Sequence, residues 1–209
     1  RNAPTGDVYF RPLVYKSSVQ LTPRLRGIDD ELAIYMMPMG DYLDTQRGQK
    51  VIVSSWTRIT DNIIPARGNI TGGYINSSLA KVEALRAGYD EAIMLAPNGL
   101  VAECTGENIF AVRNGVIITP PLSAGALEGI TQHTVMTIAR DLGFDVRVDN
   151  LARSDLYIAE EIFVCGTAAE VSSVNSVDDR KLPCPGPITR SIADIYARTV
   201  RGEEDRYKG

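Results

Sequence analysis

The chain has 209 residues, 44% of them hydrophobic and 23% charged, and its net charge at pH 7 is −4. This globular composition with an acidic balance argues against nucleic acid or an anionic membrane as a partner, and without a membrane-length apolar run or a secretion signal we expect a cytoplasmic protein. Three cysteines without CxxC spacing and one histidine make a disulfide framework or a metal site unexpected.

Two strands are predicted in the first forty residues. Residues 7–17 alternate aromatic or β-branched side chains with polar ones, and residues 32–38 form an apolar run. A turn and a polar, glycine-bearing stretch follow, which places a linker at 42–48. Residues 50–58 are then predicted to open a larger domain as a strand. The polar opening without an initiator methionine leads us to expect that further sequence precedes this chain.

A helix is predicted to begin near Tyr74. Its apolar residues recur at helical spacing and are Ile75, Leu79, Val82 and Leu85. Lys81 is two residues beyond Leu79, which is roughly 200° around the helix. We therefore expect Lys81 to point away from the apolar stripe and into solvent.

Residues 101–131 combine an acidic pair, a hairpin and the start of a helix. The runs 109–112 and 116–119 flank Arg113-Asn114-Gly115, and Asn-Gly between two β-rich runs is the strongest short hairpin signal. Gly129-Ile130-Thr131 then precedes an apolar helical pattern, with Thr131 as the predicted N-cap. Because the first N–H groups of a helix lack partners within it, this helix start is a candidate anion site.

Strands and helices alternate in the rest of the chain. Further strands are predicted at 92–95, 145–148 and 162–165. Ser154-Asp155 is predicted to cap a short helix through Ala159, and Pro187 to start the terminal helix. Small residues at 166–169 follow a strand end, where backbone groups can approach an anion closely. The pattern predicts an α/β fold in which α and β elements are mixed.

Two motifs give the chain a resemblance to a known family. Glu103-Cys104-Thr105-Gly106-Glu107-Asn108-Ile109-Phe110, followed by Leu127-Glu128-Gly129-Ile130-Thr131, resembles the signature of the fold-type IV aminotransferases, which use pyridoxal 5′-phosphate (PLP). Within that family the branched-chain amino acid aminotransferases are the most similar. The resemblance implies two domains: residues 1–41 as the remainder of a small N-terminal domain, 42–48 as the interdomain linker and 49–209 as the large PLP-binding domain.

The resemblance implies cofactor-binding roles for six residues. Glu103 would meet the ring nitrogen of PLP, and Tyr74 would donate to the ring oxygen. The other four are Leu127 beneath the ring and, at the phosphate, Ile130, Thr131 and Thr167. A glutamate such as Glu103, taken alone, is most often a surface carboxylate, and it is the order and spacing of the motifs that carry the assignment. Glu107 is assigned a structural role.

Substrate-binding roles are implied for Tyr9, Arg11, Tyr42 and Ala168. Arg11 would hold the side-chain carboxylate of glutamate, because a guanidinium meets a carboxylate with two parallel hydrogen bonds. Tyr9 and the N–H groups near Ala168 would hold the substrate α-carboxylate, and Tyr42 would line the pocket. From composition alone, Tyr9 and Arg11 are also compatible with a solvated strand face, and Tyr42 with a tyrosine packed in the linker.

Asn69 stands where the family has the lysine that forms a Schiff base with PLP. A carboxamide nitrogen cannot form that bond, and it cannot act as the general base. Lys81 is predicted to be solvated and so is not expected to replace it. Three explanations stay open: an introduced substitution, an artefact of how a modified lysine was recorded, or a natural relative that has lost transamination.

The expected function is PLP-dependent transamination between leucine, isoleucine or valine and 2-oxoglutarate, impaired in this chain by Asn69. The alternatives are another fold-type IV activity, namely D-amino acid transamination or aminodeoxychorismate lyase chemistry, and a non-catalytic homologue. The resemblance also implies small-molecule amino acid and 2-oxo acid partners and a homodimer or higher homo-oligomer.

Overall fold

The computed structural model describes residues 5–39 and 47–207, and the chain divides into two compact units, residues 1–42 and 43–209. Residues 40–46 are outside the described part of the chain. They include Tyr42 and most of the linker predicted at 42–48.

The smaller unit is an antiparallel pair of strands. β1 (Val8–Lys16) and β2 (Asp30–Pro38) pair in register from Val8 opposite Pro38 to Lys16 opposite Asp30, which confirms the two strands predicted here. Because side chains two apart share one face of a strand, Tyr9 and Arg11 are neighbours. The Arg11 guanidinium carbon lies 5.1 Å from the centre of the Tyr9 ring.

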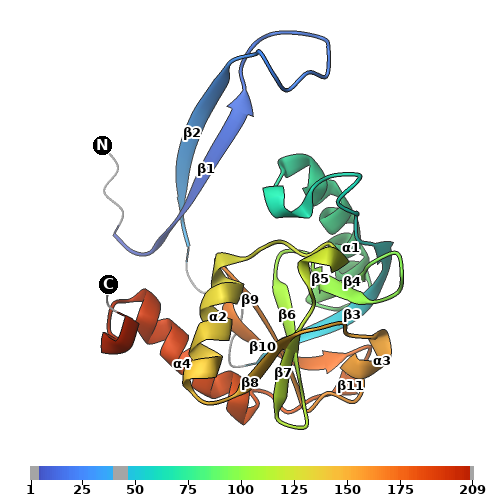
Figure 1. Ribbon diagram of the computed structural model, residues 1–209, viewed down its shortest axis with the longest axis vertical. Coiled ribbons are helices and arrows are strands. Elements are labelled where there is room, and N and C mark those ends of the chain that lie inside the picture. The colour runs from blue at the N-terminus through green and yellow to red at the C-terminus, as the bar shows by residue number, and fades with distance from the viewer. Residues whose placement is uncertain (1–4, 40–46, 208–209) are drawn as a thin grey trace. The chain divides into compact units, whose positions relative to one another are not determined.

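The larger unit is built on a nine-stranded mixed sheet within the described residues (Figure 1). In spatial order its strands are β5 (Val101–Cys104), β4 (Glu91–Leu95), β3 (Gln49–Thr57), β10 (Glu170–Val177), β9 (Glu161–Gly166), β6 (Asn108–Arg113), β7 (Val116–Thr119) and β8 (Asp145–Val148), with β11 (Arg180–Lys181) beside β10. The strands predicted at 50–58, 92–95, 145–148 and 162–165 are confirmed within one residue at each end.

Strand β10 joins the two halves of this sheet, and the sequence pattern had not predicted it. Its first half pairs antiparallel with β9 and its second half pairs parallel with β3, with a shift of register between Val174 and Ser176. Such an irregularity breaks the two-residue period of a strand. The apolar residues Val171, Val174 and Val177 recur at every third position. The sequence therefore lacks the alternation by which a strand is recognised.

The two faces of the sheet bury different side chains from the same strands. In β6 and β9, Ile109 and Val164 belong to one core cluster, whereas Phe110 and Phe163 belong to another. The Phe110 and Phe163 rings stack with their centres 4.8 Å apart. Both strands are therefore apolar on both faces, as is typical of the middle of a sheet that is covered on each side.

Helices cover the sheet on separate parts of its surface. The helices are α1 (Tyr74–Arg86), α2 (Ile130–Asp141), α3 (Arg153–Leu156) and α4 (Pro187–Val200), with short 3₁₀ turns at Ala66–Gly68, Thr71–Gly73, Leu122–Ala124 and Asp205–Tyr207. α1 packs on β3 and β4, whereas α2 and α4 lie side by side over β9 and β10 (Figure 1). The short helix predicted through Ala159 ends earlier, at Leu156.

Helix α1 presents the face opposite to its most apolar stripe to the sheet. Ala80 and Ala84 are fully buried, while Ile75 is 67% exposed and Leu85 56% exposed. The prediction that Lys81 is solvated is wrong, because its Nζ lies 2.7 Å from the Asp90 carbonyl oxygen and 2.5 Å from Glu91 Oε2. Small residues let the helix approach the sheet closely, and this favours the alanine face over the larger stripe.

Two local predictions are confirmed in detail. The β6–β7 hairpin turns at Asn114 and Gly115, whose φ angles of 51° and 72° are those of a type I′ turn. Helix α4 begins at Pro187, as predicted. Its first N–H groups are bound by the buried Glu161 of β9, which accepts hydrogen bonds from the Thr189 amide (2.8 Å) and hydroxyl (2.7 Å).

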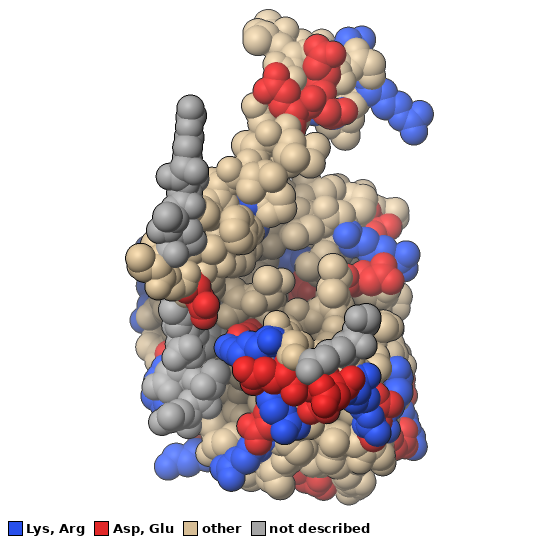
Figure 2. All heavy atoms as spheres, turned by 90° about the vertical axis from the view of Figure 1, so that its left-hand side faces the viewer, with Lys and Arg blue, Asp and Glu red and all other residues tan. Residues whose placement is uncertain are grey.

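Acidic and basic side chains intermix on the surface of the larger unit. Figure 2, which views the side that carries α4, shows them in alternation and not as a patch of one sign. Exposed ion pairs such as Arg198–Glu204, at 2.9 Å, contribute to this pattern, and each contributes little stability. Among the described residues, no helix combines the length and the apolar character that crossing a bilayer requires.

Candidate active site

Glu103, the last residue but one of β5, is the centre of the candidate site. It is 5% exposed, and its two carboxylate oxygens have different partners. Oε1 lies 2.6 Å from Nη2 of Arg58. Oε2 accepts a hydrogen bond of 2.8 Å from the Leu127 amide, and the Asn108 carboxamide nitrogen lies 3.5 Å from it. The expectation of an isolated surface carboxylate is thus excluded.

Burial and hydrogen bonding act on Glu103 in opposite directions. Burial disfavours the charged form and raises the pKa of Glu103 to about 7, whereas the Arg58 guanidinium and the Leu127 N–H lower it. The carboxyl group is therefore close to its ionisation threshold at neutral pH. Small changes in the charge beside it decide whether it is a hydrogen-bond acceptor only or an acid that also donates.

Tyr74 and Asn69 lie together at the start of α1. The Tyr74 hydroxyl donates to Asn69 Oδ1 over 2.8 Å. Asn69 has φ 44° and ψ 44°, the left-handed conformation that asparagine adopts more readily than most residues. Tyr74 is one helical turn before Ser77, which accepts a hydrogen bond from Arg58. The helix that Tyr74 begins is thus tied through Ser77 and Arg58 to Glu103.

The start of α2 lies beside the same cluster. The prediction that Thr131 is the N-cap is wrong. The cap is Gly129, which makes no side-chain capping bond, and the helix begins at Ile130. A Cβ on Gly129 would overlap the carboxamide oxygen of Asn108, so a side chain there would displace that carboxamide. Asn108 also donates to the Leu127 carbonyl oxygen over 2.9 Å, which ties this loop to β6.

The first turn of α2 supplies free backbone donors. The first intrahelical hydrogen bond that reaches back to the cap runs from the His133 amide to the Gly129 carbonyl. The amides of Ile130 and Thr131 precede it and have no partner within the helix. The Thr131 side chain is buried and hydrogen-bonds Tyr196 of α4. Its amide is therefore the group that it offers to an anion.

The turn between β9 and β10 brings Thr167 and Ala168 to this region. Asn108 pairs with Cys165 across β6 and β9, one residue before Gly166. A Cβ on Gly166 would lie 3.4 Å from the Gly106 carbonyl oxygen, so the turn after β9 lies against the turn after β5. Thr167, the next residue, is exposed.

Glu107 belongs to a second buried group of charges. Burial, and after it the nearby Glu91 carboxylate, raise the pKa of Glu107 to about 8, against the opposing effect of the Lys81 ammonium. Glu91 in turn binds Lys81 and accepts a 2.5 Å hydrogen bond from the Thr105 hydroxyl. These contacts are within the protein, in keeping with the structural role predicted for Glu107.

Arg58 and Asn108 are the site residues that sequence reasoning missed. Each makes contacts to segments distant in sequence, which no local pattern reveals. Most of the predicted site residues belong to the larger unit. They are Asn69, Tyr74, Glu103, Leu127, Ile130, Thr131, Thr167 and Ala168. Tyr9 and Arg11 are in the smaller unit, and Tyr42 is outside the described residues.

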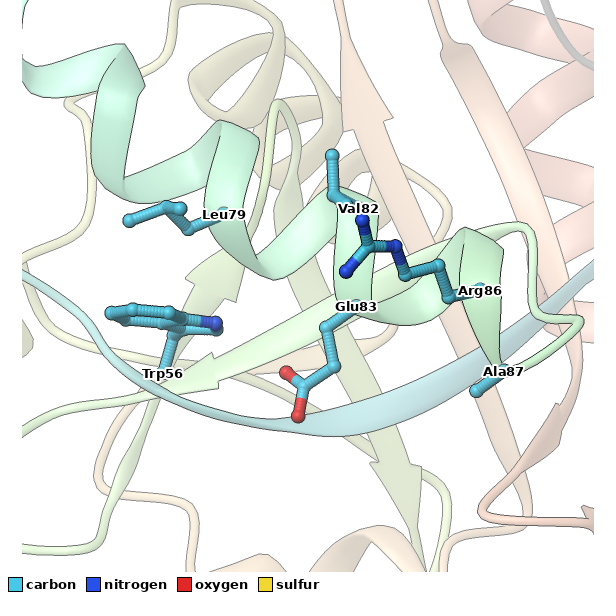
Figure 3. Close-up of a pocket in the computed structure, with 6 residues that line it drawn as sticks. All are labelled: Trp56, Leu79, Val82, Glu83, Arg86 and Ala87. Atoms are coloured by element: carbon cyan, nitrogen blue, oxygen red, sulfur yellow. The ribbon is translucent and has the colours of Figure 1, made fainter.

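A separate hollow of about 470 Å³ lies between α1 and the end of β3 (Figure 3). It is lined by Trp56, Leu79, Val82, Glu83, Arg86 and Ala87. Leu79 lies over the Trp56 ring, and the Glu83 carboxylate is turned to β3, where it accepts hydrogen bonds from Ser54 and Ser55. No predicted site residue lines this hollow.

In the described ranges, no group of His, Cys, Asp and Glu is arranged to hold a metal ion.

Comparisons with known proteins agree with this geometry. The family model described as "Amino-transferase class IV" matches residues 1–177, so the chain belongs to the class IV aminotransferase family. Within that family its relatives are branched-chain aminotransferases. It is 48% identical over 205 residues to a "Probable branched-chain-amino-acid aminotransferase" of Aquifex aeolicus, covering 97% of this chain and 66% of that protein. It is 41% identical over 206 residues to the Pseudomonas aeruginosa branched-chain-amino-acid aminotransferase, covering 96% and 67%.

Solved structures extend the likeness to three dimensions. The branched-chain aminotransferase of Thermoproteus uzoniensis with norvaline has a TM-score of 0.92 at 46% identity, covering 96% of this chain and 67% of that one. The PLP form of the Thermobaculum terrenum enzyme has a TM-score of 0.91 at 40% identity, covering 96% and 66%. The predicted fold class is confirmed. The chain spans about two thirds of the length of these relatives.

Proposed function

We propose that the protein binds PLP and transfers amino groups between branched-chain L-amino acids and 2-oxoglutarate. The observation that carries the proposal is the buried Glu103 carboxylate, held by Arg58 and the Leu127 amide within one cluster with the uncapped start of α2. An acid at one end and free amides at the other suit a cofactor that has a basic ring nitrogen and a phosphate.

The residues of the cluster fit the parts of PLP. When bound, PLP stabilises negative charge at the substrate α-carbon. Glu103 would accept the hydrogen bond of the protonated ring nitrogen and Tyr74 would donate to the ring oxygen. Ile130 and Thr131 would bind the phosphate through their amides, with Thr167 adding its hydroxyl, and Leu127 would pack under the ring.

Substrate recognition is proposed for residues of both units. Arg11 would hold the side-chain carboxylate of glutamate or 2-oxoglutarate with its planar guanidinium. Tyr9 and the amide of Ala168 would bind the α-carboxylate, and Tyr42 would line the pocket. The Thermoproteus uzoniensis branched-chain aminotransferase, whose structure contains norvaline, supports an aliphatic amino donor. Family resemblance further supports a cytoplasmic homodimer, which sedimentation equilibrium would test.

Asn69 limits what this chain does with the cofactor. Its carboxamide cannot bond covalently to PLP and cannot move the substrate α-proton. We expect non-covalent binding and half-reactions slower by orders of magnitude than with lysine. The hydrogen bond between Tyr74 and Asn69 is the observation that favours the second candidate, a homologue that binds PLP without catalysing transfer.

Titration with PLP, followed by absorbance and by quenching of protein fluorescence, tests the binding step. The proposal predicts saturable binding that Glu103→Gln weakens by about tenfold or more, since a hydrogen bond to a charged group is lost. Glu203→Gln, at an exposed position, is the matched control. Equal binding by all three proteins would place the cofactor elsewhere.

The reaction is tested with an Asn69→Lys variant and a panel of amino donors. Transfer from L-leucine, L-isoleucine and L-valine to 2-oxoglutarate, with L-glutamate as product, is the expected result. Transfer from D-amino acids would favour D-amino acid transamination, and pyruvate release from aminodeoxychorismate would favour the lyase. A variant that binds PLP and transforms none of these substrates would support the non-catalytic homologue.

A further inference from the structure

Arg58 is a buried cation whose three nitrogens all have partners. It follows β3 and is 9% exposed. Its Nη2 lies 2.6 Å from Glu103 Oε1, its Nη1 donates to Ser77 Oγ over 3.1 Å, and its Nε donates to the Gly125 carbonyl over 3.2 Å. The guanidinium therefore joins β5, α1 and the loop before α2. A planar fork with a partner at each of its nitrogens has little freedom to move.

The backbone around Arg58 is fixed as well. The Ile59 amide donates to Asn76 Oδ1 over 3.1 Å, and the Asn76 carboxamide donates to the Thr57 carbonyl over 2.9 Å. Gly125 has φ 89°, and a Cβ there would lie 2.9 Å from the Ile59 carbonyl oxygen. The loop before α2 thus closes directly on the arginine, and it does so at a position that only glycine fits.

Glu103 keeps an unused capacity to accept hydrogen bonds. A carboxylate offers about four lone-pair sites. Arg58 occupies one at Oε1 and the Leu127 amide occupies one at Oε2, with the Asn108 nitrogen at the longer distance of 3.5 Å. The carboxylate is therefore held from two sides in one orientation, with acceptor sites left for a further donor.

We propose that Arg58 is a positioning residue for the cofactor: it orients the Glu103 carboxylate and favours its ionised form, so that Glu103 accepts the hydrogen bond of the protonated ring nitrogen. This inference rests on the proposed function, since it assumes that Glu103 meets PLP. In this role Arg58 acts on the cofactor only through Glu103. A neutral residue at position 58 would then weaken recognition of the ring nitrogen and leave recognition of the phosphate unchanged.

Electrostatics supports this role. Burial raises the pKa of Glu103 to about 7 even with Arg58 in place, so loss of the guanidinium would raise this pKa further. The other charged groups in this part of the core, Glu107, Glu91 and Lys81, form a group of their own. At neutral pH, Glu103 without Arg58 would be protonated, and a neutral carboxylic acid is a weaker acceptor for a pyridinium.

The experiment compares two ligands, PLP and 1-deazapyridoxal 5′-phosphate, in which a C–H group replaces the ring nitrogen. Dissociation constants are measured at pH 7 for the parent protein and for Arg58→Met, Arg58→Gln and Arg58→Lys. The parent should prefer PLP by about tenfold or more, because only PLP donates to the carboxylate. The neutral variants should lose most of this preference, and Arg58→Lys should recover part of it.

Arg113→Met is the matched control, since Arg113 pairs with Asp155 at 2.8 Å on the exposed side of the hairpin; its preference for PLP should equal that of the parent. If Arg58→Met does not fold, Arg58→Gln gives the same comparison with two hydrogen-bonding groups retained. The inference is supported if the neutral variants lose the preference for PLP and still bind the deaza analogue as tightly as the parent.

Four outcomes overturn the inference, and they separate it from the proposed function. If neutral variants lose affinity for both ligands alike, or retain the preference of the parent, Arg58 has a structural role and PLP binding stands. If the parent binds both ligands equally, Glu103 does not meet the ring nitrogen. If the parent binds neither, the proposed function falls and this inference falls with it.

Discussion

Position 69 determines how the protein would hold its cofactor. We expect Asn69→Lys to create a covalent link to PLP, because an ε-amino group can bond to the cofactor aldehyde and a carboxamide cannot. The change should also cost about 1 kcal/mol of folding stability, because φ 44° is less favourable for lysine than for asparagine. Borohydride reduction followed by mass spectrometry measures the link, and urea unfolding measures the stability.

The parent chain is the control for that experiment and should show no PLP adduct after reduction. An adduct at Lys81 in the parent would contradict the account, since Lys81 is bound to Glu91. Absence of an adduct in Asn69→Lys, at a PLP concentration that saturates the parent, would show that position 69 does not face the cofactor aldehyde.

Glu107 should make the stability of the protein depend on pH. Its pKa is raised to about 8 in the folded protein, from 4.5, so folding takes up a proton between these values. The stability associated with the protonated carboxyl is complete at low pH and is lost as the pH rises through about 8. Glutamine cannot ionise. Glu107→Gln should therefore gain stability over the parent as the pH rises, on the order of a few kcal/mol at pH 9.

Urea unfolding at pH 5, 7 and 9 measures this difference. Glu203→Gln, at an exposed position, should follow the parent at each pH and so serves as the control. A difference between Glu107→Gln and the parent that stays constant or shrinks as the pH rises would show that Glu107 is ionised in the folded protein.

At the scale of elements, α1 packs through its small residues. Ala80 is fully buried between the helix and the sheet, whereas Ile75 is exposed. Ala80→Leu should cost about 1–3 kcal/mol of stability because a filled core does not accept three further carbon atoms without strain. Ile75→Ala should change stability by less than about 0.5 kcal/mol. Thermal unfolding of the two variants compares the faces, and the reverse order of cost would refute the assignment.

Helix α4 depends on a carboxylate from β9. Glu161 is buried and binds the Ile188 and Thr189 amides and the Thr189 hydroxyl. Glu161→Ala should cost about 2–4 kcal/mol, because three donors lose a partner in the interior. Glu160→Ala, at the exposed neighbouring position, should cost distinctly less. Equal costs in chemical denaturation would show that the buried carboxylate does not anchor the helix.

The elements found from the sequence are those whose signals are local. The Asn114-Gly115 turn and Pro187 at the start of α4 act within a few residues and were predicted correctly. Strand β10 was missed because its register shift hides the alternation. The inward face of α1 was misjudged because alanine beside a sheet carries little hydrophobic signal. These features depend on partners far away in the sequence.

The same distinction applies to the site. Glu103, Leu127 and the start of α2 lie in continuous motifs, and the contacts between Glu103 and Leu127 bring those motifs together. Arg58 and Asn108 were not predicted, because each is recognised only by the residues that it joins in space. Thr131 was taken as a cap from its type, whereas Gly129 is the residue that fits against Asn108.

For the whole molecule, the larger unit carries the residues proposed to bind PLP, from Tyr74 to Thr167. The smaller unit carries Tyr9 and Arg11, which are proposed to bind substrate. PLP affinity should therefore be insensitive to Arg11→Met, whereas the Michaelis constant for 2-oxoglutarate in the Asn69→Lys background should rise at least about tenfold, as expected when a bidentate carboxylate contact is lost. An unchanged Michaelis constant would remove Arg11 from the site.

A crystal structure of the protein with PLP tests the central claim most directly. The account predicts the ring nitrogen within hydrogen-bonding distance of Glu103 and the phosphate at the amides of Ile130 and Thr131, with Thr167 beside it. PLP bound elsewhere, for example in the hollow beside Trp56, or bound with its phosphate at Glu103's end of the site, would contradict the account.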